Sequence, residues 1–77
     1  MLIFIMRDKQ KKFIELGEKR VDKAITMLRL IRNLSNRNHY DYDETQANKI
    51  IKALDAEIQE LKTSFRKGIT KKKSFKL

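Results

Sequence analysis

The chain changes character at residues 35–43, where the sequence reads SNRNHYDYD. Asn36 and Asn38 tolerate the left-handed backbone conformation that ends helices in place of glycine. Asp43 is a typical N-cap residue, and Gln46, three residues later, completes a capping box. Tyr42, just before the cap, is placed to pack on Ala47 as a hydrophobic staple. This stretch therefore predicts the end of one helix and the start of another.

Apolar residues on both sides of this break recur with helical spacing. The seam before the break consists of Ile14, Gly17, Val21, Ala24, Leu28 and Ile31, and the seam after it consists of Ala47, Ile51, Leu54, Ile58, Leu61 and Phe65. Steps of three and four residues are typical of paired helices. We therefore predict an all-α fold, an antiparallel two-helix hairpin resembling a coiled coil, with helices at about residues 8–35 and 43–67. One continuous helix is the competing prediction, and the cap chemistry at Asp43 argues against it.

The ends of the chain differ from its centre. Gly68 is a natural residue to follow a helix C-terminus, so residues 68–77 are expected to form a basic tail. The whole chain, residues 1–77, is expected to be a single domain. Gly17, on the first seam, suggests that another backbone approaches closely there. Residues 1–7 are expected to be an apolar extension. Either Met6 is the natural start and residues 1–5 precede it, or residues 2–5 form an edge strand or an early helical turn. The MLIFIM run at residues 1–6 does not resemble a signal peptide, and no stretch is long enough to span a membrane.

Composition narrows the chemistry. The chain has no cysteine, no proline, two glycines and one histidine. Disulfides, thiolate metal sites and a glycine-rich phosphate loop are therefore excluded, and a turn-rich all-β fold is disfavoured. Asp41, Asp43 and Glu44 do not match the spacing of a calcium loop, and a two-helix hairpin offers no evident cleft. We expect a protein that is not an enzyme and uses no cofactor or metal.

Charge is concentrated at the two ends of the chain. The formal net charge is +9, residues 1–20 hold six basic and three acidic side chains, and residues 66–77 hold six basic and no acidic ones. Concentrated charge of one sign is typical of polyanion binding, although it also solvates a protein. Lys9, Lys11 and Lys12 are expected in the first turns of the first helix, where the helix dipole disfavours positive charge. Phe75 is placed to stack on a base. The candidate nucleic-acid-binding residues are Lys9, Lys11, Lys12, Arg66, Lys67, Lys71, Lys72, Lys73, Phe75 and Lys76.

Two further groups of residues are candidates for contacts. Arg32, Arg37 and Tyr40 mix cations with an aromatic ring near the break, although turn and cap roles explain that region better. Ile25, Met27, Leu30 and Leu34 lie off the first seam, so helix 1 has more apolar surface than helix 2 can cover. They predict an interface with residues 2–6, with a second copy of the chain in a homo-oligomer, or with another protein.

A resemblance covers a little over half of the chain, from Arg20 to Phe65. The run LRLIRNLSNRNHYDYDE at residues 28–44, followed by an amphipathic helix, resembles short uncharacterised helical-hairpin proteins of Gram-positive bacteria and their phages and plasmids. The resemblance implies two helices joined by a turn and a mobile-element setting, and it implies no activity.

Together these features predict a small, basic, cytoplasmic binding module. It would dock on nucleic acid or on a nucleic-acid-loaded protein, for example as a phage- or plasmid-encoded inhibitor of the anti-CRISPR type or as an accessory factor. The alternative is a coiled-coil homo-oligomer or protein-interaction adaptor whose charges only solvate it. A membrane-surface helix is a third reading that fits two seams less well.

Overall fold

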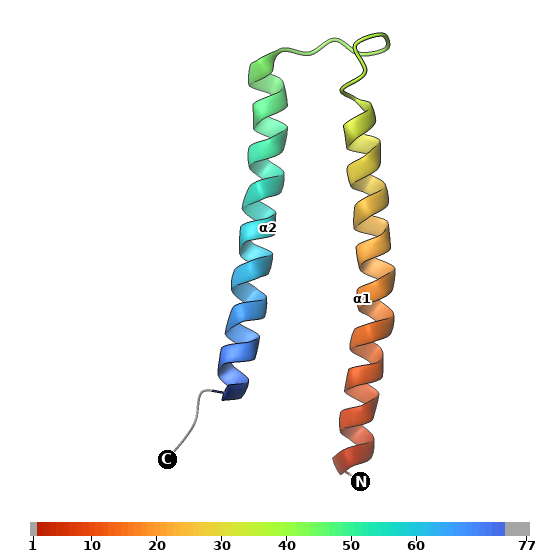
Figure 1. Ribbon diagram of the computed structural model, residues 1–77, viewed down its shortest axis with the longest axis vertical. Coiled ribbons are helices and arrows are strands. Elements are labelled where there is room, and N and C mark those ends of the chain that lie inside the picture. The colour runs from red at the N-terminus through yellow and green to blue at the C-terminus, as the bar shows by residue number, and fades with distance from the viewer. Residues whose placement is uncertain (1, 74–77) are drawn as a thin grey trace. The chain divides into compact units, whose positions relative to one another are not determined.

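The computed structural model describes residues 2–73, with the side chains of residues 8–70. This part of the chain forms two α-helices and no strand: α1 at Leu2–Asn33 and α2 at Glu44–Lys73 (Figure 1). The all-α prediction is confirmed, and the helices are separated at the predicted break. The chain divides into two units, Met1–Tyr40 and Asp41–Leu77, and each is described by itself.

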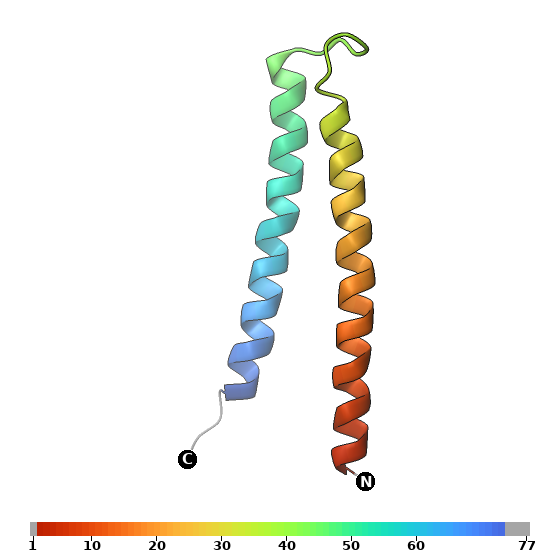
Figure 2. The same ribbon diagram turned by 45° about the vertical axis from the view of Figure 1, so that its right-hand side comes forward.

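Each helix extends beyond its predicted bounds at one end, and α1 ends at Asn33, two residues before its predicted end. α1 begins at Leu2 rather than near residue 8, because the segment before Ile14 contains neither glycine nor proline. α2 continues through Gly68 to Lys73, so the predicted helix end at Gly68 is wrong, and residues 68–73 belong to the helix rather than to a tail. No glycine in the described part has the positive φ of a helix-ending residue. Both helices run on without a sharp kink in two views (Figures 1 and 2).

α1 ends by tightening its last turn. The backbone N–H groups of Leu34, Ser35 and Asn36 donate to the carbonyl oxygens of residues 31, 32 and 33, over 3.0, 3.0 and 3.2 Å. These bonds span three residues rather than four, as in a 3₁₀ turn, and satisfy carbonyl groups that an α-helix end leaves free. The predicted left-handed asparagine is wrong, because no residue in the described part other than glycine has positive φ.

Asn36 instead shapes the turn through its oxygen atoms. Its side-chain Oδ1 accepts a hydrogen bond from the backbone N–H of Asn38 at 3.0 Å. Its carbonyl oxygen accepts from the N–H groups of His39, at 3.1 Å, and Tyr40, at 3.0 Å. A short amide side chain that bonds its own backbone two residues on is a common turn former, and Asn36 has this role here.

The start of α2 is a capping box. Gln46 N–H donates to Asp43 Oδ1 at 2.7 Å, and Asp43 N–H donates to Gln46 Oε1 at 3.0 Å. Asp43 is therefore the N-cap, as predicted, and its carbonyl accepts the first helical bond from Ala47 at 3.1 Å. Tyr42 and Ala47 are both half-buried, as expected at the two positions of a hydrophobic staple.

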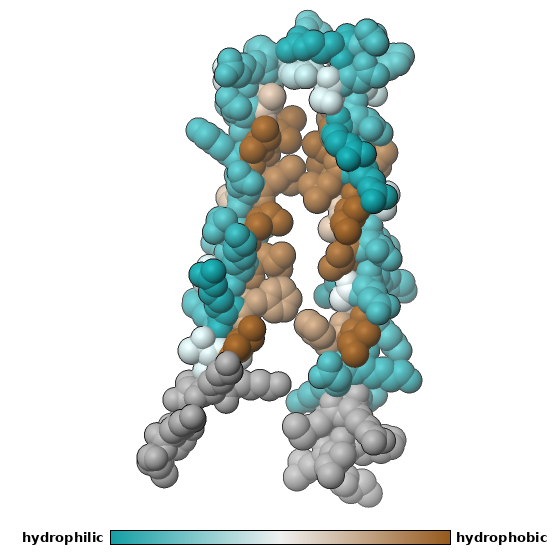
Figure 3. Space-filling view, viewed as in Figure 1, coloured by the Kyte–Doolittle hydropathy of each residue, from teal (hydrophilic) through white to brown (hydrophobic). Residues whose placement is uncertain are grey.

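Apolar side chains recur along each helix, and polar ones cover the connecting segment (Figure 3). No residue within 8–70 is buried in this description: Val21 of the first seam is 56% exposed and Ile51 of the second is 54% exposed. A Cβ atom added at Gly17 would meet nothing within 4 Å. Pairing of the two seams, and a close approach of a backbone at Gly17, stay predictions.

Candidate nucleic-acid interface

Charge changes sign along α2. Before residue 61 the helix carries four acidic residues and two lysines. Glu60 is its last acidic residue, and from Lys62 onward every charged residue of the helix is basic. These cations are Lys62, Arg66, Lys67, Lys71, Lys72 and Lys73. We call residues 62–73 the cationic segment of α2.

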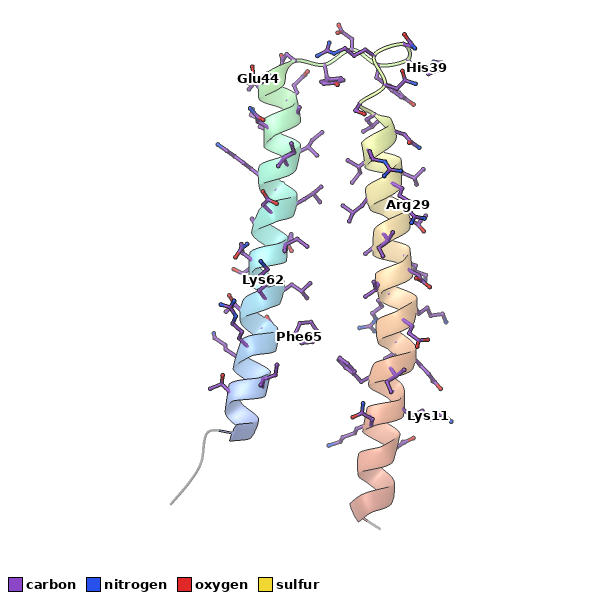
Figure 4. All side chains as sticks on the ribbon, viewed as in Figure 1. Lys11, Arg29, His39, Glu44, Lys62 and Phe65 are labelled. Carbon is purple, nitrogen blue, oxygen red and sulfur yellow. The ribbon has the colours of Figure 1, made fainter. Side chains whose placement is uncertain are left out.

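Three of these cations share one face of the helix, whereas Lys72 falls at the angular position of the apolar stripe. At about 100° per residue, Lys62, Arg66 and Lys73 lie within about 40° of one another around the helix axis. Ile58, Leu61, Phe65 and Ile69, each at least 44% exposed, form an adjoining apolar stripe. Lys62 and Phe65 lie within one turn of each other on α2 (Figure 4). The sequence prediction missed Lys62 because it counted charge by segment, and the four-residue step to Arg66 is the signal that identifies it.

The hydrogen-bond donors in the cationic segment are its charged groups and the hydroxyl groups of Ser64 and Thr70. Thr63 also lies there, but its hydroxyl donates to the carbonyl oxygen of Gln59 at 3.0 Å, so its proton is used within the helix. The C-terminal end of a helix also favours cations, because its last carbonyl groups carry partial negative charge. The lysines at 71–73 therefore occupy a favourable end of the helix.

Lys9, Lys11 and Lys12 are exposed on α1, but the helix does not bring all three together. Lys9 and Lys12 are three residues apart and share a face, whereas Lys11 lies about 160° from Lys9 around the axis. Lys11 shares its face with acidic Glu15 and Glu18. Because α1 begins at Leu2, the three lysines lie beyond its first turn, where the dipole is felt most. The predicted dipole penalty is therefore wrong.

The face of Lys9 and Lys12 continues along α1 as a second stripe. Its members recur at steps of three and four residues, except that Lys19 and Arg20 are adjacent and lie on its two edges. Apart from Leu16 it is cationic up to residue 23 and apolar after it, and the sequence prediction missed the cations at 19, 20 and 23. The members of the second stripe are Lys9, Lys12, Leu16, Lys19, Arg20, Lys23, Met27, Leu30 and Leu34.

The predicted apolar interface is only partly a single surface. Met27, Leu30 and Leu34 share the second stripe, and Met27 is 61% exposed. Ile25 lies about 160° from Met27 around the axis, beside the first seam. The four predicted residues therefore lie on both sides of the seam, and their role as an interface stays a prediction.

The connecting segment holds the secondary candidates. Arg32 lies in the last turn of α1. Tyr40 is 49% exposed, and its ring meets the ring of His39 edge to face, with centroids 6.4 Å apart and planes at 68°. Arg37 lies in the turn that Asn36 organises. Phe75 and Lys76 lie outside the described residues.

The described residues contain no helix with the length and apolar character to cross a membrane. They also contain no group of three or more His, Cys, Asp or Glu side chains placed to hold a metal ion. No protein-family model matches the chain, and no curated protein or solved structure matches it significantly.

Proposed function

We propose that this protein is a non-enzymatic module that docks on nucleic acid, or on a protein loaded with nucleic acid, through its basic residues. The observation that carries the proposal is the cationic segment of α2, which runs from Lys62 to Lys73 without an acidic residue. Phosphate contacts need dense positive charge on an accessible surface, and Lys62, Arg66 and Lys67 are exposed. A role as a phage- or plasmid-encoded inhibitor or accessory factor, acting in the cytoplasm, belongs to the same proposal.

The test is a salt titration of binding. Wild type and a Lys71→Gln/Lys72→Gln/Lys73→Gln variant are titrated onto duplex and single-stranded ligands at several salt concentrations. The observed log K on duplex DNA falls by about 0.9 per phosphate contact for each log unit of salt, so each lost contact reduces the slope by about one. We expect a weaker affinity and a shallower slope for the variant.

The control replaces one lysine whose face of the helix carries acidic residues instead of further cations. Lys11→Gln removes the same kind of charge beside Glu15 and Glu18 on α1, and it should change the slope least. Phe75→Ala should weaken binding only to single-stranded ligands, where stacking contributes about 1–3 kcal/mol per base. Equal slopes for wild type and the triple variant would contradict the proposal.

A second candidate function is favoured by the exposed apolar stripes. Val21, Ile51 and Met27 each expose more than half of their surface. Helices with such stripes associate with other helices, so a coiled-coil homo-oligomer or protein-interaction adaptor is the alternative. Salt separates the two, because hydrophobic association does not weaken steeply with salt as phosphate binding does. A pull-down with and without nuclease treatment separates them in extracts.

A further inference from the structure

We propose that the cationic segment of α2 binds duplex DNA as a helix, and that Gly68 controls the affinity by setting how firmly this helix is formed. This inference rests on the proposed function, and it adds the form of the ligand and the conformation that binds. It starts from the finding that α2 runs through Gly68 to Lys73.

Two features of the cationic segment disfavour a helix that stands alone, although its lysines suit the helix C-terminus. Gly68 has a low helix propensity, because glycine gives up more backbone freedom than any other residue. Lys62 and Arg66, on the face that would meet the ligand, are four residues apart, where like charges on a helix repel each other. A polyanion removes this repulsion, so its binding and the formation of the helix favour each other.

The geometry of a formed helix selects the ligand. A helix with its side chains is about 10–12 Å across, and the major groove of B-form DNA is about 12 Å wide. Lys62, Arg66 and Lys73 then lie along one side over about 16 Å, at 1.5 Å per residue. The major groove of duplex RNA is too narrow and deep for side chains to read. Duplex DNA is therefore the ligand that a rigid cationic helix fits.

Gly68 permits a test that leaves every charge in place. A Cβ atom added at Gly68 meets nothing within 4 Å, and its backbone has no positive φ, so alanine fits without strain. Gly68→Ala favours the helix and should raise the affinity for duplex DNA by up to about fivefold. Gly68→Pro breaks the helix and should lower the affinity, although the net charge is unchanged.

Gly17→Ala is the matched control. Gly17 also lies within a helix, and a Cβ atom there also meets nothing within 4 Å. The exchange stabilises α1 and leaves the cationic segment of α2 untouched, so the affinity should stay within error of wild type. An equal gain in both alanine variants would overturn the proposal, because it would show an effect of general stability.

The experiment uses the full-length chain and fluorescence anisotropy with a short labelled DNA duplex, an RNA duplex of the same sequence, and single strands. Circular dichroism of the same mixtures should show helix gained on binding, and less gained by Gly68→Ala than by wild type. Unchanged affinity in both Gly68 variants, or equal binding to duplex RNA, would overturn the inference while leaving polyanion binding intact. No binding of wild type to any nucleic acid would overturn direct nucleic-acid binding, and with it both this inference and the first form of the proposed function.

Discussion

Asp43 and Gln46 exchange two hydrogen bonds and so fix the first residue of α2. Replacing an N-cap aspartate by alanine costs about 0.5–2 kcal/mol, because a backbone N–H at the helix start loses its partner. We expect Asp43→Ala to lower the free energy of unfolding by this amount in chemical denaturation. Gln46→Ala should cost less, and the double variant should cost less than the two single variants together, because they remove one shared unit.

Asp41→Ala is the control for the capping box. It removes the same carboxylate two residues earlier, outside the box, and should change stability by no more than about 0.5 kcal/mol. If Asp41→Ala costs as much as Asp43→Ala, the loss comes from charge rather than from the cap.

Single residues show what sequence patterns predict and what they do not. The box at Asp43 was predictable because its two partners are three residues apart, and no distant contact decides the outcome. Gly68 was misread because a glycine in a helical pattern is compatible both with an end and with an interior position. The residues that follow decide between the two, and here three lysines and no proline follow.

At the scale of one helix, Leu28 and Leu30 are a natural pair for comparison. Leu28 lies on the first seam and Leu30 on the second stripe of α1, and both are exposed in α1 as described by itself. If the two seams pair, Leu28→Ala should cost about 2–5 kcal/mol, and so should Leu54→Ala in α2. So small a domain has little stability to lose, and both variants should unfold.

Leu30→Ala is the matched variant, because it removes the same atoms two residues away. Its effect should be small at low protein concentration and grow as the concentration rises, if another chain covers the second stripe. Thermal unfolding at several concentrations measures both variants. Equal and concentration-independent losses would show that the seam and the second stripe are covered alike within one chain.

The sorting of charge around each helix was the part of the candidate site that sequence counts could not predict. Counting by segment placed Lys11 with Lys9 and left Lys62 in a neutral stretch. Angular position depends on the helix being continuous, and the predicted bounds stopped α2 before Lys73. Lys9, Lys11, Lys62 and Arg66 lie within the predicted helices, so helical steps of three and four residues could have sorted them. Only the place of Lys73 needed the observed end of α2.

At the scale of the whole molecule, apolar surface predicts self-association. Met27 and Leu30 on α1, with Leu34 in the turn that follows it, are exposed apolar residues, and such surfaces are covered when a partner binds. Light scattering at micromolar concentration should show more than a monomer, and the melting temperature should rise with protein concentration.

A triple exchange of these three residues to serine should shift the protein to the monomer. High salt should leave the wild-type assembly in place, since its contacts are apolar. A chain that is a stable monomer, and that also tolerates loss of residues 1–5, would refute assembly through this surface.

The reciprocal bonds at the start of α2 have one more consequence. Donor and acceptor both lie within the unit Asp41–Leu77, so the signal that starts the helix is carried by the helix's own segment. A capping box of this kind does not depend on the residues that precede it. A peptide excised at residue 41, or a foreign segment grafted ahead of that residue, should leave Glu44 as the first helical residue. Recombination could therefore replace the segment before residue 41 and leave the N-cap of α2 in place.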